Sequence, residues 1–256
     1  MSTKRPFFVI IPGASQNPAH YGYLSHLLQL AGYPVFSALL PSVGAAGKVT
    51  ADDDAKYIRD SMLIPVLDHE EHDVIIVMHS YSSVPGSAAA KGLGKMQRGD
   101  KKTGVIGQIY LSALLPKGGD GKDIVGAFGG QYPPHIRPDL PANLLRCDDR
   151  IPPLYHDAPA ELADAVAVSA MAQGMTSFTS PCPRATWDSD EYKGRVAFIR
   201  TLNDAAIPLP VQQMMLDATS VEWIVKDIES SHSPQISQPE KLTNILLGMA
   251  KVFEAL

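Results

Sequence analysis

The sequence is poor in cysteine, in charged residues and in long hydrophobic runs. Its 256 residues include two cysteines, Cys147 and Cys182, too few for a disulfide framework or a four-cysteine zinc site. Charged residues make up 19% of the chain and the net charge is −5, so we expect neither nucleic acid nor an anionic membrane as a partner. No apolar run approaches the roughly 20 residues that span a bilayer, and residues 7–11 are too few for the apolar part of a signal peptide. We therefore expect a cytoplasmic protein that acts on a small-molecule substrate, and the sequence leaves a homodimer open.

Short apolar runs alternate with helical patterns along most of the chain. The hydrophobic content of 45% is typical of a folded protein. We predict strands over residues 7–11, 35–39, 74–78, 105–111, 196–202 and 221–228. Segments with helical spacing lie between them, and a last helix is predicted over residues 239–256. Strands that are separated by helices predict an α/β fold with a mostly parallel central sheet flanked by helices.

The alternating pattern breaks down between residues 116 and 186. Prolines and the pairs Gly118-Gly119 and Gly129-Gly130 interrupt this stretch, and only residues 160–173 show helical spacing. So long an irregular stretch inside a compact domain is usually a functional insertion. We predict a core formed by residues 1–116 and 187–256, with residues 117–186 inserted as a cap over the sheet.

Ser80 lies where the most strand-like run of the chain meets an alanine-rich helix. A sharp strand-to-helix turn lifts its central side chain above the sheet, and small neighbours are favoured there, as in the pattern G-x-S-x-G. Here the frame reads Met78-His79-Ser80-Tyr81-Ser82, so both glycines are replaced. The context predicts a nucleophilic serine, and an ordinary serine at a helix N-terminus is the alternative.

A serine nucleophile needs a base and a carboxylate that orients the base. Asp204 follows the strand predicted over 196–202, and His232 follows the one predicted over 221–228. Open α/β sheets place their sites at these carboxyl ends of strands. We predict a catalytic triad of Ser80, Asp204 and His232. Asp227 is a rival for the acid because it lies five residues before the histidine, although it falls within its own strand.

Two backbone N–H groups are expected to bind the oxyanion of the reaction. We assign them to Tyr81, directly after the nucleophile, and to Ala14 in the loop after the first strand, which could also be a plain turn. The predicted substrate-binding residues are Gly13, Ser15, His79, Phe128, Tyr132, Tyr155, Phe178 and Trp187. The aromatic members of this set either line an apolar pocket or hold the cap to the core, and the sequence leaves both readings open.

Two segments resemble cofactor or metal sites without meeting their requirements. Residues 68–73 read Asp-His-Glu-Glu-His-Asp, but a zinc protease needs H-E-x-x-H on one helix face. Gly92-Leu93-Gly94 lacks the third glycine and the strand-to-helix setting of a dinucleotide site. The basic residues between 91 and 102 are typical of a solvated loop. We expect no metal and no organic cofactor.

Several stretches resemble the α/β-hydrolase superfamily, and more narrowly its branch of plant methylesterases and hydroxynitrile lyases. They are Val9–Ser15, Val77–Tyr81, Tyr110–Pro116, Asp204–Pro208 and His232–Leu242. This resemblance implies an α/β-hydrolase fold. It also implies that Ser80, Asp204 and His232 act as nucleophile, acid and base, with Ala14 and Tyr81 as the oxyanion hole.

The departures from that branch bear on the reaction. The family's first loop usually has His before the glycine, where this chain has Pro12. The lyase members have Thr in that loop and Lys directly after the histidine, where this chain has Gly13 and Ser233. These differences favour hydrolysis of a small, fairly apolar carboxylic ester or lactone through an acyl-enzyme. Two alternatives stay open: a lyase, cyclase or decarboxylase that uses His232 as acid and base, and a receptor-like protein that only binds its ligand.

Overall fold

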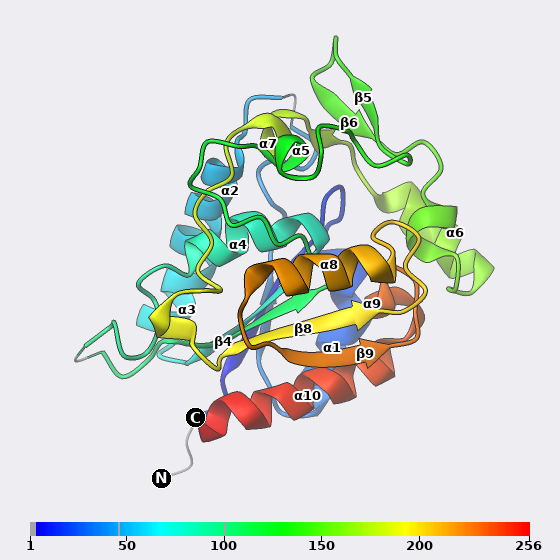
Figure 1. The fold of residues 1–256 in the computed structure, drawn as a ribbon. Helices are drawn as coiled ribbons and strands as arrows, with labels where there is room; N and C mark the ends of the chain where they lie inside the picture. The colour runs from blue at the N-terminus through cyan, green and yellow to red at the C-terminus, as the bar shows by residue number, and fades with distance from the viewer. Residues whose placement is uncertain (1–3, 46, 100) are drawn as a thin grey trace.

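The computed structural model describes residues 4–45, 47–99 and 101–256, and a six-stranded parallel sheet runs through its centre. The order across the sheet is β2-β1-β3-β4-β8-β9 (Figure 1). The strands are β1 (Phe7–Ile11), β2 (Val35–Ser37), β3 (Val74–His79), β4 (Val105–Leu111), β8 (Val196–Thr201) and β9 (Ile224–Ile228). Together with its flanking helices, this sheet confirms the predicted α/β class.

The central strands are buried on both faces, which explains their continuous apolar sequences. Every residue of β3 and β4 is buried. Successive side chains of a strand point to opposite faces, so Val9 and Ile11 join one hydrophobic cluster while Phe8 and Ile10 join the other. The sheet therefore separates two apolar layers, and its carboxyl edge is left for polar side chains.

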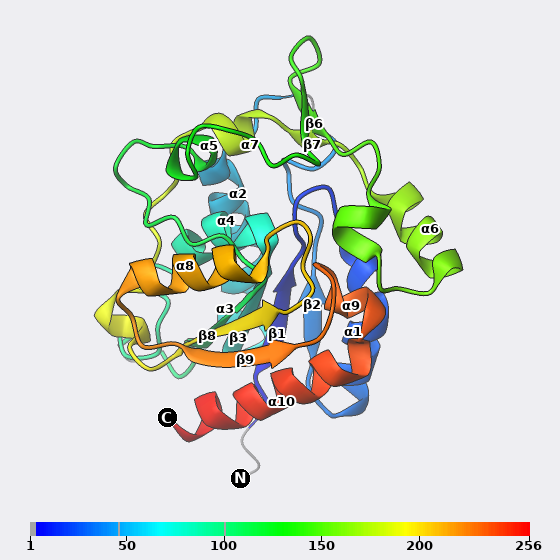
Figure 2. The ribbon, with the colours of Figure 1, turned by 45° about the vertical axis from the view of Figure 1, so that its right-hand side comes forward.

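Helices cover both faces of the sheet (Figures 1 and 2). On one face lie α1 (Gly22–Leu30), with η1 (Pro18–Tyr21) before it, and α10 (Pro239–Ala255), with the short α9 (Pro234–Ser237) before it. The other face carries α2 (Ala51–Tyr57), the π-helical turn η2 (Ile58–Leu63), α3 (Ile64–Asp68), α4 (Ser83–Ala89) and α8 (Leu209–Thr219). In the part of the chain that is described, no helix combines the length and the apolar character needed to cross a membrane.

The segment between β4 and β8 builds a separate, smaller layer. It contains α5 (Ile124–Ala127), β5 (Arg137–Asp139), β6 (Leu144–Arg146), η4 (Ile151–Tyr155), α6 (Ala160–Ser169), β7 (Gln173–Gly174), α7 (Thr176–Thr179) and η5 (Asp190–Tyr192). Strands β5, β6 and β7 form an antiparallel sheet of their own. Both views place α5, α7 and this small sheet on the side of the molecule away from α10. We call residues 117–186 the inserted segment.

Three predicted elements differ from those observed by more than one residue. The strand predicted over 35–39 ends at Ser37, and the one over 221–228 begins only at Ile224. The helix predicted over 160–173 ends at Ser169, because Ala170 has an extended backbone with φ −75° and ψ 140° and Gln173 pairs in β7. The small sheet has strands of two or three residues, too short to give a periodic signal.

Candidate active site

Ser80 occupies a tight turn between β3 and α4. Its backbone has φ 55°, in the left-handed region that non-glycine residues seldom adopt. Neighbouring hydroxyl groups hold the turn: Ser82 Oγ donates to the carbonyl oxygens of Ile11 and His79 at 2.8 and 2.9 Å, and Ser83 Oγ donates to that of Ser80 at 2.8 Å. The strained turn predicted for a nucleophile is therefore present, with serine hydroxyls fixing it in place of the second glycine.

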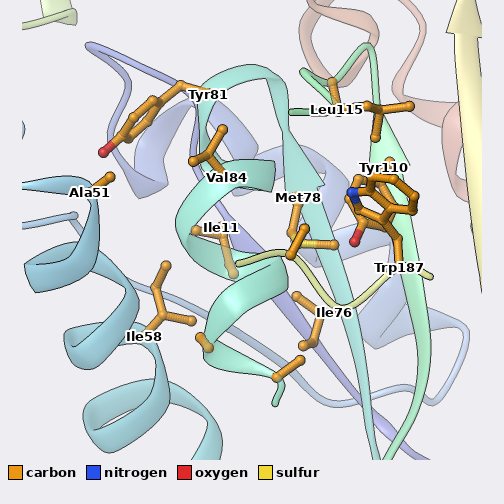
Figure 3. Packing of buried hydrophobic residues seen from close by; sticks show 14 of the residues in the cluster. Ile11, Ala51, Ile58, Ile76, Met78, Tyr81, Val84, Tyr110, Leu115 and Trp187 are labelled. Carbon is orange, nitrogen blue, oxygen red and sulfur yellow. The ribbon is translucent and has the colours of Figure 1, made fainter. Parts of the chain in front are cut away.

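Met78 is accommodated because α4 has a glycine beside it. A Cβ atom built on Gly86 would lie 2.8 Å from Met78 Sδ and 3.0 Å from Ile11 Cδ1, closer than such atoms pack. Figure 3 shows the Met78 side chain among Ile11, Val84 and Tyr110, on the face of β3 that α4 covers. The bulk of Met78, at the first position of the strand-to-helix turn, is thus offset by the missing side chain of Gly86 on the helix that follows.

Asp204 and His232 form a hydrogen-bonded pair at the carboxyl end of the sheet. His232 Nδ1 lies 2.8 Å from Asp204 Oδ2, and both side chains are almost completely buried. Thr201 Oγ1 donates to the same oxygen at 2.7 Å, as does Ser112 Oγ. The other oxygen, Oδ1, accepts the N–H groups of residues 206 and 207, each at 2.8 Å. A carboxylate with this many donors is fixed in position and fixes the imidazole in turn.

The same contacts keep Asp204 ionised. Burial alone would raise the pKa of Asp204, but the charge of His232 and the hydrogen bonds from His232, Ile207 and Ser112 outweigh it and hold the pKa well below the ordinary value of 3.8. Asp227, the rival acid, pairs with Arg200 at 2.7 and 2.9 Å, and its side chain is 44% exposed. The structure therefore puts Asp204 and not Asp227 beside the histidine.

A buried hydrogen-bond chain joins three loops around the site. His79 Nε2 lies 2.8 Å from the carbonyl oxygen of His232, which can only accept, so Nε2 carries the proton. The Tyr21 hydroxyl donates to Gln16 Oε1 and accepts the Gly13 N–H at 3.1 Å, and its oxygen lies 2.7 Å from His79 Nδ1. Burial, followed by the charge of His232, lowers the pKa of His79 to about 3, so the ring is neutral at neutral pH. His79 is thus a link between the loops of Gly13 and His232.

The loop after β1 has the close packing expected of an oxyanion site. A Cβ atom on Gly13 would lie 3.0 Å from His79 Nδ1 and 3.3 Å from Gln16 Oε1, so a larger residue would have to displace these groups. The N–H of Gly13 is bound by Tyr21, and that of Ser15 donates to Gln173 Oε1 at 3.0 Å. Ala14 lies between these two residues, and its N–H has no hydrogen-bond acceptor in the described part of the chain. Gln173 comes from the inserted segment, which therefore contacts this loop directly.

One cavity brings together residues from the core and from the inserted segment. Its volume is about 90 Å³. It is lined by Ser80 and His232 and by six of the residues predicted from the sequence: Gly13, Ala14, Ser15, His79, Tyr155 and Phe178. The nucleophile and base of the predicted triad therefore face the same space.

The other predicted residues lie away from this cavity. The Tyr81 side chain is buried and points toward Ala51 of α2 (Figure 3). Its ring is stacked on Phe178 at 4.9 Å and its hydroxyl donates to Asp54 at 2.7 Å, so only its backbone N–H can serve the site. Phe128 and Trp187 line a separate groove beside α8. Tyr132 is half-buried and packs against the core. Phe128 and Tyr132, both in the inserted segment, pack against the core cluster.

Several residues of the site have no signal in the sequence. Ser112 contacts both members of the pair, since its Oγ also lies 3.1 Å from His232 Nδ1. Gln16, His135 and Arg150 line the cavity. Ser112 directly follows a predicted strand, and this position at the carboxyl edge is the one feature that could have marked it. Arg150 and His135 lie in proline-rich stretches without periodicity.

The segments set aside from the sequence have structural roles. His72 Nδ1 lies 2.7 Å from the carbonyl oxygen of Arg5, and Asp68 pairs with Arg98 and Lys101. Among the described residues, no group of three His, Cys, Asp or Glu side chains is arranged to hold a metal ion. The basic residues near 98 are therefore at least partly neutralised within the chain.

Comparison with known proteins identifies the family to which this fold belongs. The model of the alpha/beta hydrolase family matches residues 8–245. The chain is 25% identical over 251 residues to the alpha/beta hydrolase nvfD of Aspergillus novofumigatus, covering 96% of this chain and 97% of that protein. It is 26% identical over 260 residues to a pyrethroid hydrolase of Sphingobium wenxiniae, covering 94% and 86%. The crystal structure of methylesterase MES16 from Arabidopsis has the same fold, with a TM-score of 0.72 at 22% identity over 96% of this chain and 99% of that one. Since the family model spans nearly all of the sequence, the protein belongs to the alpha/beta hydrolase family.

Proposed function

We propose that the protein is a serine hydrolase that cleaves a small, fairly apolar carboxylic ester or lactone. The observation that carries the proposal is that Ser80, in its strained turn, lines one cavity with His232, whose ring is held by Asp204 at 2.8 Å. A ligand-binding protein has no need for this combination, whereas nucleophilic catalysis needs all three groups. Relatives named as a pyrethroid hydrolase and a methylesterase support the same class of reaction.

In this mechanism Ser80 Oγ attacks the ester carbonyl and its proton passes to His232 Nε2. The N–H groups of Ala14 and Tyr81 stabilise the negative charge that develops on the carbonyl oxygen. The tetrahedral intermediate collapses, the alcohol leaves with the proton from His232, and an acyl-enzyme remains. Water then attacks the acyl group, gives a proton to the same nitrogen, and the acid is released as the proton returns to Ser80. Asp204 stabilises the imidazolium in both steps.

The lining of the cavity indicates a small substrate. Aliphatic and aromatic side chains form much of it, among them Leu114, Ile136, Leu154, Phe178 and Ile207. A volume of about 90 Å³ leaves room for a short acyl or alcohol group. Ser233, where the resembling lyases have lysine, is completely buried and has no charge to offer a leaving anion. Hydrolysis is therefore the reaction that the lining supports best.

Hydrolysis of a panel of methyl and p-nitrophenyl esters and lactones tests the proposal. We expect turnover that falls as the acyl chain lengthens, and a loss of about 10⁴-fold or more in kcat for Ser80→Ala. The matched control Asp227→Asn, at the edge of the sheet away from the pair, should keep wild-type kcat. Turnover that persists within tenfold in Ser80→Ala would contradict an acyl-enzyme and favour chemistry by His232 alone.

A further inference from the structure

Among the described residues, Arg150 is the one arginine that lines the cavity of Ser80 and His232. It lies in the inserted segment, directly before η4. Its Nη1 donates to the carbonyl oxygen of Ala167 at 3.2 Å, which anchors the guanidinium between η4 and α6. Its charge acts on other residues of the cavity, because it lowers the pKa of Tyr155, although burial raises that pKa more strongly. A fixed cation therefore stands in an otherwise largely apolar wall.

This cation has no counter-ion among the described residues. Its Nε is buried without a hydrogen-bond partner, and no Asp or Glu of the described chain lines the cavity. Asp148, two residues earlier, is bound to Arg137 instead. Other arginines of the chain do have carboxylate partners: Arg98, Arg137, Arg146, Arg184 and Arg200. A buried donor without a partner costs free energy, and the cost is larger on a charged group. An acceptor on a bound ligand would remove this cost at Arg150 Nε.

Two other arginines of the chain show what the edge formed by Nε and Nη2 binds. Arg137 uses Nε and Nη2 to hold both oxygens of Asp148 at 2.6 and 2.9 Å. Arg200 holds Asp227 in the same way at 2.7 and 2.9 Å. In Arg150 the bond to Ala167 uses Nη1, on the opposite side, and Nε is buried without a partner. This planar fork matches the two oxygens of a carboxylate.

We propose that Arg150 binds a free carboxylate on the substrate, so that the substrate class is an ester that also carries an acid group, such as a monoester of a dicarboxylic acid. The carboxylate pairs with the Nε edge after a small rotation of the guanidinium toward the cavity, and the ester carbonyl lies at Ser80. Burial, followed by the charge of His232, lowers the pKa of His135 to about 4, so this neighbouring side chain is neutral at pH 7 and does not compete for the anion. The inference rests on the proposed serine hydrolysis and replaces one apolar end of its substrate by a carboxylate.

A matched pair of substrates tests this inference. The probes are the monomethyl and dimethyl esters of glutarate and of adipate, and the readout is methanol release at pH 7.5. For the wild-type protein we expect kcat/KM to be at least tenfold higher for the monoester. Arg150→Gln should lower kcat/KM for the monoester about 30-fold or more and leave the diester within threefold. Arg150→Lys, which keeps the charge but lacks the fork, should recover only part of the loss.

The diester and a second arginine provide the controls. Unchanged hydrolysis of the diester shows that Arg150→Gln is folded and keeps its machinery. Arg137→Gln, which removes an exposed cation from the same segment, should leave both rates unchanged. A wild-type preference for the diester, or an equal loss on both esters in Arg150→Gln, overturns the inference while the proposed function stands. Failure of the wild-type protein to cleave any ester, p-nitrophenyl acetate included, overturns the proposed function itself.

Discussion

The sheet and the inserted segment contribute to the same cavity in contrasting ways. On the sheet side, Asp204 accepts hydrogen bonds through both of its oxygens, and His79 uses both of its ring nitrogens. On the inserted side, the lining is mostly apolar, and Arg150 leaves its Nε without a partner. Groups that are fully satisfied by the protein are held in one geometry, whereas an unsatisfied group is free to bind a ligand. In the function we propose, the sheet supplies the reaction, and in the role we propose for Arg150 the inserted segment selects the substrate.

The largest effect is expected at the acid, where the choice between two aspartates can be tested. Asp204→Asn should lower kcat by about 10⁴-fold, because the amide favours the wrong tautomer of His232. Asp227→Asn should leave kcat within twofold, since Asp227 binds Arg200 and is half-exposed. Steady-state kinetics on the best ester of the panel measures both. A larger loss in Asp227→Asn than in Asp204→Asn would reverse the assignment.

A second prediction concerns the pH dependence of stability on the sheet side. The pKa of His79 is lowered from 6.5 to about 3 in the folded state, so between these values the unfolded chain binds a proton that the folded protein does not. Stability is therefore complete above about pH 6.5 and falls as the pH drops, and His79 should contribute about 1.4 kcal/mol per pH unit. His135, with its pKa at about 4, and His20, whose pKa is also lowered by burial, add slopes of the same sign.

Urea unfolding at pH 6, 5 and 4.5 measures this slope. His79→Gln should reduce it by about 1.4 kcal/mol per pH unit, the share of one proton. The exposed His26 provides a control, because His26→Gln removes a histidine without changing the buried chain. Equal slopes for the wild type and His79→Gln would show that His79 is not held neutral.

The smallest of these effects concerns the packing of Met78 against Gly86, beside the turn of Ser80. Gly86→Ala should destabilise the protein by about 1–3 kcal/mol, because its Cβ would meet Met78 Sδ and Ile11 Cδ1 at 2.8 and 3.0 Å. In a Met78→Gly background the same change should be neutral or stabilising, since alanine favours the helix. A double-mutant cycle from denaturant unfolding gives the coupling. Additive effects would mean that the glycine does not compensate for Met78.

The sequence was informative wherever strands are buried on both faces. Continuous runs of Val and Ile marked β3 and β4, and the residues after strand ends were then forced to one edge of the sheet, which is how Asp204 and His232 could be paired in advance. Met78 looked unfavourable because its compensation, Gly86, lies on the next helix and depends on three-dimensional packing.

The sequence of the inserted segment predicted much less of its structure. Its two- and three-residue strands have no periodicity, and its aromatic residues divide between the cavity and a separate groove: Phe178 lines the first and Phe128 the second. Their composition alone could not separate these roles. Arg150 was missed for the same reason, because what distinguishes it is a missing partner, which only the folded arrangement shows.

Covalent trapping of the nucleophile tests the central claim most directly. The protein is incubated with a fluorophosphonate, and the modified residue is located by mass spectrometry, with Ser80→Ala and Asp204→Asn in parallel. The account predicts one adduct on Ser80, slower labelling in Asp204→Asn and none in Ser80→Ala. A folded wild-type protein that remains unlabelled, or that is labelled at another serine, would contradict an activated Ser80.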